Sequence, residues 1–392
     1  MFTPTKVKEE AKGLSERKAE KHVKVYVTNF TCPSMHVCLK NVFFAEESHD
    51  GQTMEHSKHT SLKDLARVLG VSIPTVSRAL KDSPDISRDL CERAKRLAQE
   101  MNYRPNPFAM SLRKNTPRII GVIVPDIVTH FFASIVSGIE DTAVANGYFV
   151  IITTSHESYE HEKRNIENLV NMRVEGIIAC LSQETTDYSH WAALADINMP
   201  LILFDRVCLT DRFPSVVADG EQSARAATQH LLDTGSRRVA FIGGANHLDI
   251  VKRRKHGYLE ALRDNRIPIE KELVVCRKID YEEGKAATES LLALPQPPDA
   301  ILAMNDTLAF AAMEVIKSHG LRIPQDVALI GYTDEQHANY VEPKLSAVCH
   351  QTYQMGQTAC RLLIDRLKGD KTVRQVVVPT SLQIRESSVK EG

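Results

Sequence analysis

Short apolar runs alternate with longer amphipathic segments from Arg118 almost to the end of the chain. The first runs are IIGVIVP, YFVIITT, GIIACL and PLILFD, and a second series that starts near VVAD continues with RVAFIGG, LVVCRKID, DAILAMND and DVALIGY. Alternation at this spacing is typical of βαβ units, whose parallel sheets are covered by helices on both faces. Since about 270 residues exceed one such sheet of usual size and the pattern restarts midway, residues 118–388 are predicted to form two doubly wound parallel-sheet lobes of the α/β class.

Residues 58–104, which we call the headpiece, show a different pattern of short helices. Ser61 with Asp64 three residues later forms a helix start signal, and Gly70 ends that helix because glycine adopts a left-handed conformation at little cost. The apolar face of this helix is formed by Leu62, Leu65, Ala66 and Leu69. The headpiece is therefore predicted to be all-α and to begin with a short amphipathic helix.

The next helix is shorter and more polar. Ser72 can cap it by accepting a hydrogen bond from the amide of Thr75, and Pro74 falls in the first turn, where a missing N–H costs little. Val76 and Leu80 are predicted to face inward. The residues predicted to face outward are Ile73, Pro74, Thr75, Ser77 and Arg78.

A third helix is predicted from about Arg88, with Leu90, Ala94, Leu97 and Met101 on one face. Two helices joined by a tight turn and supported by a third form a helix-turn-helix, whose short second helix is sized to lie in a DNA major groove. Arg78 could then bond to a guanine. The alternative is a small helical bundle with a solvated face.

The segment YRPNPFAMSLRKNTPR follows the headpiece. Asn106 can cap a helix of one to two turns that ends near Arg113, but so short a helix is marginal in water and would need to be ordered by a partner. Leu112 lies beside Arg113 and Lys114, so an apolar wedge for a DNA minor groove is flanked by two phosphate-binding charges. The alternative is a linker with one exposed leucine.

Charge is distributed unevenly, although the formal net charge of the whole chain is only −1. Residues 58–118 contain 13 Lys or Arg and six Asp or Glu, so the remainder of the chain is acidic. A basic segment on an acidic body indicates that one end of the protein meets a polyanion.

Several other classes of protein lack support in the sequence. It has no run of 18 apolar residues and no apolar signal core near Met1, so neither a membrane protein nor a secreted protein is expected, and the cytoplasm fits best. The eight cysteines lack metal spacing, and CPSMHVC around Cys32 and Cys38 has no second ligand pair. Without a phosphate-binding glycine loop or a nucleophile motif, we expect no enzyme, no cofactor and no metal site.

The run from Ser61 to Arg118 resembles the lactose-repressor/galactose-repressor (LacI/GalR) family of bacterial transcription regulators. The motifs that carry the resemblance are DLARVLGVSIPTVSRAL and NYRPNPFAMSLR, and the similarity extends over roughly residues 60–388. It implies a helix-turn-helix headpiece, a hinge over residues 105–117, and an effector-binding and dimerisation domain of the periplasmic-binding-protein-like type I fold over residues 118–388.

The resemblance also implies roles for individual residues. Leu112 would intercalate at the centre of a palindromic operator, and Ile73 and Pro74 lie where the family reads bases. Because Pro74 offers no side-chain hydrogen bond, the base read there is not predicted. The expected DNA-binding residues are Ser72, Ile73, Pro74, Thr75, Ser77, Arg78, Asn106, Leu112 and Arg113.

A ligand site is predicted at the carboxyl ends of the strands, between the lobes. Polar and aromatic residues gather at those ends, and carboxylate, amide, guanidinium and ring together suit a sugar or a nucleoside. Singly, each has a structural alternative, since an Asp after a strand usually caps the next helix. The candidates are Phe131, Phe132, Asp205, Arg254, Asn305 and Asp334.

By resemblance, all of these candidates except Asp334 match effector-pocket positions of the family. The family commonly has Asp directly after the GY of the strand LIGY, whereas this chain has Thr333 there and Asp334 follows. Ile279 stands where the family has another aromatic residue. These departures leave the effector unnamed.

Both regions together predict a sequence-specific transcriptional regulator, expected to be a repressor, that binds double-stranded DNA as a homodimer under control of a small effector, expected to be a carbohydrate. The alternative is a solute-binding protein with a non-functional DNA-binding segment. Residues 1–55 resemble nothing in the family. We expect either that Met54 is the natural start or that residues 1–53 are disordered, the rival being a real module that adds DNA contacts.

Overall fold

The structure is a computed structural model that describes residues 23–29, 40–46, 60–103 and 118–390. Contacts divide the chain into two units, residues 1–105 and 106–392, and each is described by itself.

The first unit begins with a pair of strands. β1 (Val23–Asn29) and β2 (Lys40–Glu46) are antiparallel. The structure therefore places two strands in the N-terminal extension, and the expectation that Met54 is the natural start or that residues 1–53 are disordered stays a prediction. Their sequences, VKVYVTN and KNVFFAE, are rich in β-branched and aromatic residues, which favour a pleated strand without any longer-range periodicity.

The headpiece contains the three predicted helices, α1 (Leu62–Leu69), α2 (Ile73–Ala79) and α3 (Arg88–Glu100). A capping box starts α1, because the Ser61 side chain accepts from the Asp64 amide while the Asp64 carboxylate accepts from the Ser61 amide. The helix then ends at a left-handed glycine, Gly70, with φ of 67°. The three helices, the start of the first at Ser61 and its end at Gly70 are therefore confirmed as predicted from local sequence.

A small apolar core holds these helices together. Leu65 of α1 and Val76 of α2 are fully buried, and partly buried residues of α3, among them Leu97, pack against them. A second cluster joins Ala79 of α2 to Cys91 and Ala94 of α3. Packing against α1 and α3 therefore stabilises α2, because a helix this short is not stable by itself in water.

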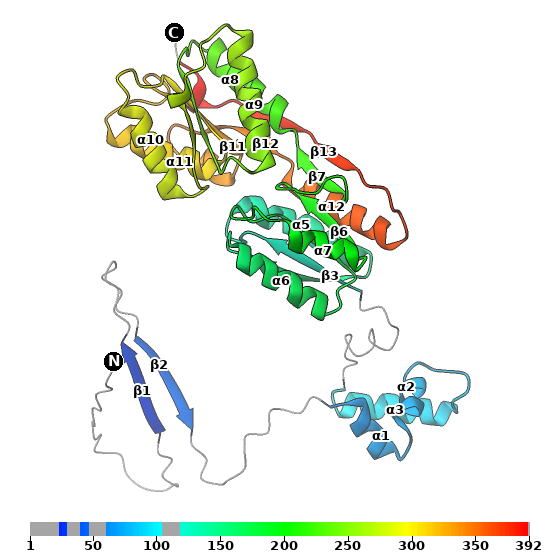
Figure 1. Ribbon diagram of the computed structural model, residues 1–392. Helices are drawn as coiled ribbons and strands as arrows, with labels where there is room; N and C mark the ends of the chain where they lie inside the picture. The colour runs from blue at the N-terminus through cyan, green and yellow to red at the C-terminus, as the bar shows by residue number, and fades with distance from the viewer. Residues whose placement is uncertain (1–22, 30–39, 47–59, 104–117, 391–392) are drawn as a thin grey trace, which may run out of the picture. The chain divides into compact units, whose positions relative to one another are not determined.

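The second unit contains two six-stranded sheets, as predicted (Figure 1). The first lobe has the strand order β13-β7-β6-β5-β3-β4 and every pair is parallel. Its strands are β3 (Ile119–Val124), β4 (Phe149–Thr154), β5 (Gly176–Ala179), β6 (Leu201–Phe204), β7 (Ser215–Ala218) and β13 (Gln375–Val378). Its helices are α5 (His130–Ala145), α6 (Tyr159–Asn171), α7 (Ser189–Asp196) and α12 (Thr352–Leu367).

The second lobe has the order β14-β12-β11-β10-β8-β9, in which only the edge strand β14 is antiparallel. Its strands are β8 (Val239–Gly243), β9 (Val274–Cys276), β10 (Ala300–Ala303), β11 (Ala328–Thr333), β12 (Ser346–His350) and β14 (Thr380–Gln383). Its helices are α8 (Gly220–Asp233), α9 (Asp249–Asp264), α10 (Tyr281–Leu292) and α11 (Asp306–Ser318), with the short 3-10 turns η1 (Lys271–Leu273), η2 (Gln336–Asn339) and η3 (Glu386–Ser388).

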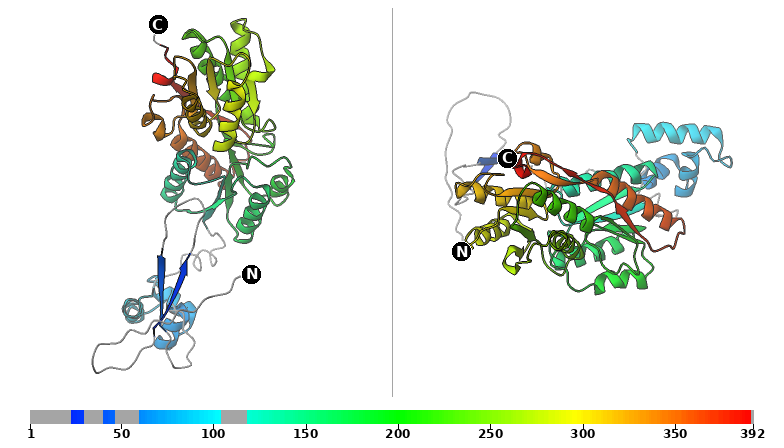
Figure 2. Two further views of the ribbon diagram at one scale, coloured as in Figure 1. Left: turned by 90° about the vertical axis from the view of Figure 1, so that its left-hand side faces the viewer. Right: turned by 90° about the horizontal axis from the view of Figure 1, so that it is seen from above.

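Helices cover both faces of each sheet, as two further views show (Figure 2). In the first lobe, side chains from one face of β3 pack with α5 and α12, and those from the other face pack with α6 and α7. This two-sided burial explains why the strands read as continuous apolar runs.

The chain crosses between the lobes three times, after β7, β12 and β13. The strand VVA therefore belongs to the first sheet, where it pairs with β6 and β13, and does not open the second lobe as predicted from the sequence. Its strand partner β13 lies about 160 residues further along the chain, so the local pattern could not reveal this pairing.

α12 lies against α5 on the first lobe (Figure 1). A Cβ added to Gly138 would come 2.2 Å from the Tyr353 carbonyl, and one added to Gly356 would come 2.0 Å from the Ile135 carbonyl. These two glycines permit backbone contact, which fixes the returning helix tightly on the lobe. Leu363 and Ile364 of this helix are buried in the lobe's own core.

Candidate functional site

The short helix α2 begins as its sequence predicts. Oγ of Ser72 accepts a hydrogen bond from the Thr75 amide at 3.3 Å and lies 2.8 Å from the Thr75 hydroxyl. Pro74 occupies the first turn, where its missing N–H leaves no helical hydrogen bond unmade. A cap and a proline together define where this helix starts and which residues follow on its exposed side.

The exposed face of α2 is narrower than predicted. Ile73 is 41% exposed, Pro74 and Arg78 face solvent, and Thr75 is partly buried. Ser77 was predicted to face outward but is only 8% exposed. The reason is that α2 packs against both α1 and α3, so two sides of the helix are covered instead of one.

Arg78 forms an ion pair with Asp85, which lies in the turn after α2. A hydrogen bond from the Ser83 side chain and the nearby charge of Arg78 lower the pKa of Asp85. Both partners are about half exposed, so the pair adds little to stability but orients the guanidinium. To bond to a guanine, Arg78 would exchange this carboxylate for the base edge.

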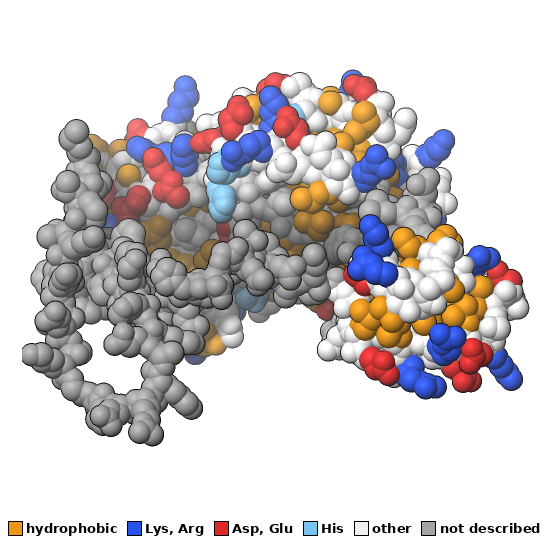
Figure 3. All heavy atoms as spheres, turned by 90° about the horizontal axis from the view of Figure 1, so that it is seen from below, with side chains coloured by type: hydrophobic (Ala, Val, Ile, Leu, Met, Phe, Trp, Pro, Cys, Tyr) orange, Lys and Arg blue, Asp and Glu red, His pale blue; other side chains and the backbone are white. Residues whose placement is uncertain are grey.

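Charges of both signs are interspersed around apolar atoms on the face of the headpiece seen in Figure 3. Residues 60–103 contain eight Lys or Arg against six Asp or Glu, which is nearly balanced. The basic excess of residues 58–118 therefore comes mainly from the ends of that segment, at Lys58, Arg104, Arg113, Lys114 and Arg118. The three predicted hinge residues, Asn106, Leu112 and Arg113, lie outside the described residues.

A cavity of about 100 Å³ lies between the two lobes of the second unit, at the carboxyl ends of the strands. The first lobe contributes Asp126, Thr129, Phe131, Phe132, Glu157, Asp205 and Arg206. The second lobe contributes Ile250, Arg254, Ile279, Met304, Asn305, Thr307, Thr333 and Glu335. Five of the six ligand candidates read from the sequence line this cavity, and the exception is Asp334.

Asp205 follows β6 in a left-handed conformation, with φ of 56°, and is buried. Its Oδ1 atom is buried and has no hydrogen-bond partner among the described residues. Burial raises the pKa of Asp205, and the charge of Arg254 opposes that effect. A ligand hydroxyl or amine would satisfy this oxygen, which is otherwise costly to leave unpaired.

Arg254 of α9 is 2% exposed and faces the same cavity. One of its Nη atoms donates to the Met304 carbonyl, and its guanidinium carbon lies 4.2 Å above the centre of the Tyr332 ring. Its Nε has no partner among the described residues. Burial lowers the pKa of Arg254, while Tyr332 and Asp205 favour the charged form.

Aromatic rings form an apolar part of the wall. Phe131 and Phe132, in the first turn of α5, meet edge to face with ring centres 5.0 Å apart. The buried ring of His350 packs behind Phe131 at 5.8 Å, and burial holds the pKa of His350 well below its ordinary value. This aromatic part of the wall is therefore neutral and suited to the apolar face of a ring-shaped ligand.

Asn305 lines the cavity and also caps α11, since its Oδ1 accepts from the Leu308 amide at 3.0 Å. Asn305 thus has a structural role as a helix cap and also lies where a ligand residue was predicted. Its amide nitrogen remains as the polar group that it can offer to a ligand.

The structure adds a pair that the sequence analysis missed. Nη1 of Arg206 lies 2.7 and 2.8 Å from the two carboxylate oxygens of Glu157, and both residues line the cavity. Arg206 is buried and directly follows Asp205 at the end of β6. Its position at the end of a strand could have identified Arg206 as a cavity residue. Its partner Glu157 could not be predicted, because the two are 49 residues apart in the sequence.

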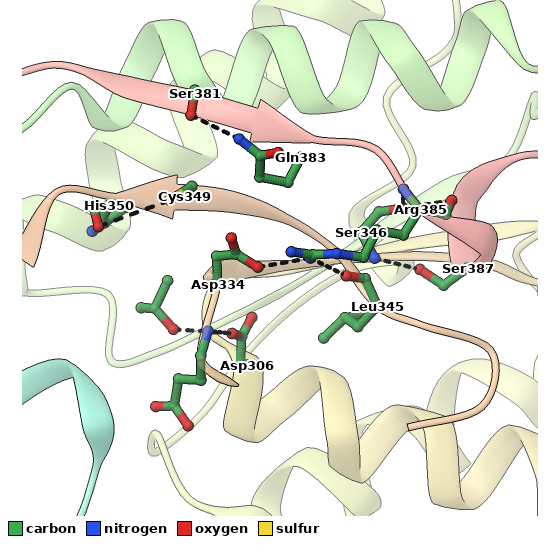
Figure 4. A network of polar contacts seen from close by, with 12 residues as sticks. Asp306, Asp334, Leu345, Ser346, Cys349, His350, Ser381, Gln383, Arg385 and Ser387 are labelled. Carbon is green, nitrogen blue, oxygen red and sulfur yellow. Dashed lines mark hydrogen bonds and ion pairs between the residues drawn. The ribbon is translucent and has the colours of Figure 1, made fainter. Parts of the chain in front are cut away.

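Asp334 does not line the cavity, so the structure does not bring it together with the other five ligand candidates. Its carboxylate pairs with Arg385 at 2.7 Å, as the close view shows (Figure 4). Both Thr333 and Asp334 have positive φ, of 97° and 58°, so the backbone turns here and directs Thr333 and Glu335 to the cavity instead. The pairing with Arg385, near the end of the chain, could not be read from the local sequence.

Asp306 lies beneath this turn and holds it. Its Oδ2 accepts from the Glu335 amide at 2.6 Å and from the Thr333 hydroxyl at 3.2 Å. Burial raises the pKa of Asp306 to about 8. This carboxyl group therefore positions two residues of the cavity wall without lining the cavity itself.

Within the described part of the chain, no group of three His, Cys, Asp or Glu side chains is arranged to hold a metal ion. None of the described helices combines the length and the apolar character needed to cross a membrane.

Comparisons with known proteins match both units. The model for bacterial regulatory proteins of the lacI family matches residues 61–106, and that for the periplasmic binding protein-like domain matches residues 228–388. The HTH-type transcriptional repressor CytR of Escherichia coli (strain K12) is 31% identical over 310 residues, covering 79% of this chain and 90% of the relative.

Two solved structures are similar as well. The lac repressor dimer bound to operator and the anti-inducer ONPF has a TM-score of 0.73 and 26% identity, covering 85% of this chain and all of that one. The transcriptional regulator CelR in complex with cellobiose has a TM-score of 0.65 and 29% identity, covering 84% of this chain and 99% of that one. The chain therefore belongs to the lacI family of bacterial regulatory proteins and is a DNA-binding transcriptional repressor.

Proposed function

We propose that this repressor acts in the cytoplasm as a homodimer on a palindromic operator, and that a sugar or sugar derivative bound between the lobes controls its affinity for DNA. The observation that carries the proposal is the cavity in which the Asp205 Oδ1 and Arg254 Nε atoms are buried without partners beside the Phe131 and Phe132 rings. Polar atoms of this kind need a ligand that supplies both a donor and an acceptor.

Ring-shaped polyols meet these requirements. Their hydroxyl groups donate to Asp205 and accept from Arg254 or the amide of Asn305, while their apolar face stacks on a phenylalanine ring. A cavity of about 100 Å³ favours a single small ring over a long oligosaccharide. The CelR structure, solved with cellobiose, supports a carbohydrate for this chain by analogy.

On the DNA side, residues 58–104 are proposed to read the operator and residues 105–117 to form the hinge, while residues 118–388 bind the ligand and the second subunit. The exposed side of α2 offers Ile73, Pro74 and Arg78 to the major groove. A twofold protein matches a palindromic site, and the lac repressor structure with operator is itself a dimer.

Control would work through the lobes. A ligand that contacts both lobes favours one arrangement of them over another, and the three crossing segments connect that arrangement to the rest of the domain. A coupling free energy of about 1–3 kcal/mol between ligand and operator would change DNA affinity by about 5–150-fold.

The test combines selection and titration. The full chain is incubated with a pool of random duplexes at fixed, near-physiological salt, and the bound sequences are read with and without a panel of sugars. We expect a palindromic consensus whose affinity changes with one class of sugar. No enriched sequence under any condition would overturn the DNA part and favour a solute-binding protein with a non-functional DNA-binding segment.

Variants separate the two sites. Asp205→Asn should abolish the response to the sugar while leaving the affinity for the operator unchanged in its absence. Arg78→Ala should weaken operator binding while leaving sugar binding to the second unit unchanged. If Asp205→Asn responded to the sugar as the unmodified protein does, the ligand would not bind in this cavity.

A further inference from the structure

Carboxylates outnumber guanidinium groups around the cavity. Four acidic side chains line it, Asp126 and Glu157 and Asp205 from the first lobe and Glu335 from the second, whereas the basic ones are Arg206 and Arg254. The other polar lining residues, threonines and Asn305, are uncharged. The wall therefore presents an excess of negative charge to anything that enters.

Both guanidinium groups are already engaged by the protein. Arg206 is neutralised by Glu157 through contacts of 2.7 and 2.8 Å and also lies 3.3 Å from the Leu181 carbonyl. Arg254 donates to the Met304 carbonyl, stacks on Tyr332 and lies near Asp205. An anionic ligand is best held by a guanidinium that offers two parallel N–H groups. Arg206 is occupied by Glu157, and the Arg254 Nε, which has no partner among the described residues, lies in a guanidinium whose charge is offset by the nearby carboxylate of Asp205.

Within the described part of the chain neither Asp126 nor Glu335 forms an ion pair with a Lys or Arg, and the two come from opposite lobes. Asp126 is held by the Val128 and Thr129 amides at 3.0 and 2.8 Å and by the Thr129 hydroxyl at 3.0 Å. The position of Glu335 is held through its own amide, which donates to Asp306. Burial raises the pKa of Glu335, the nearby His337 and His130 oppose that effect, and the charge of Asp126 adds to it.

These two carboxylates thus repel each other where the lobes meet. A ligand anion would add a third negative charge in a partly buried space, where charges are poorly screened. A hydroxyl or an ammonium group would instead donate to one or both carboxylates. Because hydrogen bonds hold both Asp126 and the backbone of Glu335 in place, the two carboxylates cannot easily move away from a bound anion.

From this arrangement we infer that the controlling ligand bears no negative charge, and that Asp126 and Glu335 select neutral or amine-bearing polyols against sugar phosphates and sugar acids. The inference rests on the proposed ligand site and specifies its chemistry. It assigns to Asp126 and Glu335 a specificity-determining role that the sequence analysis did not anticipate.

The first experiment does not depend on the identity of the ligand. Thermal unfolding of the full chain is compared for Asp126→Asn, Glu335→Gln and the control Glu167→Gln, which changes an exposed carboxylate on α6 outside the cavity. Relief of the repulsion should raise the midpoint of the second unit by about 2 °C for either cavity variant and not for the control. If neither cavity variant were more stable than the control, the charge argument would be overturned.

The second experiment tests selection directly. A panel of matched probes, glucose with glucosamine, glucose 6-phosphate and glucuronate, and the corresponding galactose set, is tested for stabilisation of the full chain at equal concentration. Every stabilising probe should be neutral or cationic, and Glu335→Gln should reduce any preference for the amino sugar. Stabilisation by a phosphate or a uronate equal to that by its neutral parent would overturn the inference.

The outcomes distinguish this inference from the proposed function. A sugar that stabilises the protein without changing operator binding would count against ligand control but leave the charge selection intact. If no probe binds, the thermal midpoints of Asp126→Asn and Glu335→Gln still decide whether the cavity is electrostatically strained.

Discussion

The Oε1 atom of Gln183, in the first lobe, accepts a hydrogen bond from the backbone N–H of Ile279, in the second lobe, at 2.8 Å. The backbone N–H of Gln183 in turn donates to the Glu157 carboxylate at 2.7 Å, and both Glu157 and Ile279 line the cavity between the lobes. A direct polar link between the lobes is therefore built from residues next to the cavity. The hydrogen bonds of Gln183 therefore connect the distance between the lobes to the positions of two residues of the cavity wall.

Replacing Gln183 with Ala should weaken ligand binding without removing any residue from the cavity wall. One hydrogen bond contributes about 0.5–1.5 kcal/mol, so the dissociation constant of the stabilising sugar should rise by about two- to ten-fold. Isothermal titration of the full chain measures this, with Gln296→Ala, an exposed residue of the second lobe, as the control. An unchanged dissociation constant would show that the link does not contribute to the bound state.

Ser72 should contribute both to the stability of α2 and to operator affinity, and two substitutions distinguish these contributions. Ser72→Ala removes the cap and should destabilise the helix by about 1 kcal/mol, whereas Ser72→Asp keeps an acceptor at the helix start. Hydrogen exchange of the α2 amides in the full chain should therefore quicken several-fold in the first variant only. Operator affinity should fall in both, because the second variant places a negative charge beside the phosphates. Retained affinity in Ser72→Asp would indicate that this end of α2 does not approach DNA.

Arg78→Ala should reduce specificity more than general affinity for DNA. If Arg78 pairs with a guanine, its loss costs about 1–3 kcal/mol at the preferred operator and relaxes the preference at that base. Fluorescence anisotropy with the operator and with single-base variants of it would measure this loss. Asp85→Asn, which releases Arg78 from its ion pair, is the matched comparison and should preserve the base preference. An equal loss on all sequences in Arg78→Ala would instead assign the residue to phosphate contact.

Leu112→Ala should weaken operator binding while leaving the salt-dependent binding to random duplex nearly unchanged. The expectation follows from the chemistry of an apolar side chain wedged between base steps, which neutralises no phosphate. Binding to both DNAs is measured across a range of salt concentrations. Equal losses on the operator and on random duplex would contradict the wedge.

Asp306 should make the stability of the second unit depend on pH. Burial raises its pKa to about 8, whereas an exposed Asp titrates near about 4. Between these values the folded state retains a proton that the unfolded state has lost, so the contribution of this group falls as pH rises from about 4 to about 8. Asp306→Asn mimics the protonated form and should remove that part of the dependence.

The measurement compares thermal midpoints at pH 5, 6, 7 and 8. The midpoint of Asp306→Asn relative to the unmodified chain should rise by a few degrees across this range. Asp326→Asn is the control, because hydrogen bonds from Arg322 lower the pKa of Asp326 to about 2 and leave it ionised throughout. Parallel curves for Asp306→Asn and the unmodified chain would show that Asp306 is ionised in the folded protein.

Local chemistry carried the sequence-based predictions that succeeded. The capping box at Ser61, the left-handed Gly70 and the Ser72 cap each depend on residues within four positions, so their signals are present in the sequence itself. The apolar runs of the strands are local too, because both faces of a parallel sheet are buried. Asp205 and Asn305 line the cavity, as expected of residues that directly follow parallel strands in this fold, and their role in ligand binding stays a prediction.

Tertiary structure alone decided the rest. Ser77 is buried because two helices cover α2, β7 joins the first sheet through a strand that returns from far along the chain, and Asp334 turns away to meet Arg385. The pairs Glu157–Arg206 and Gln183–Ile279 join residues 49 and 96 positions apart. A periodic pattern specifies which face of an element is apolar, but the partner that faces it depends on how distant elements pack, and local sequence carries no record of that packing.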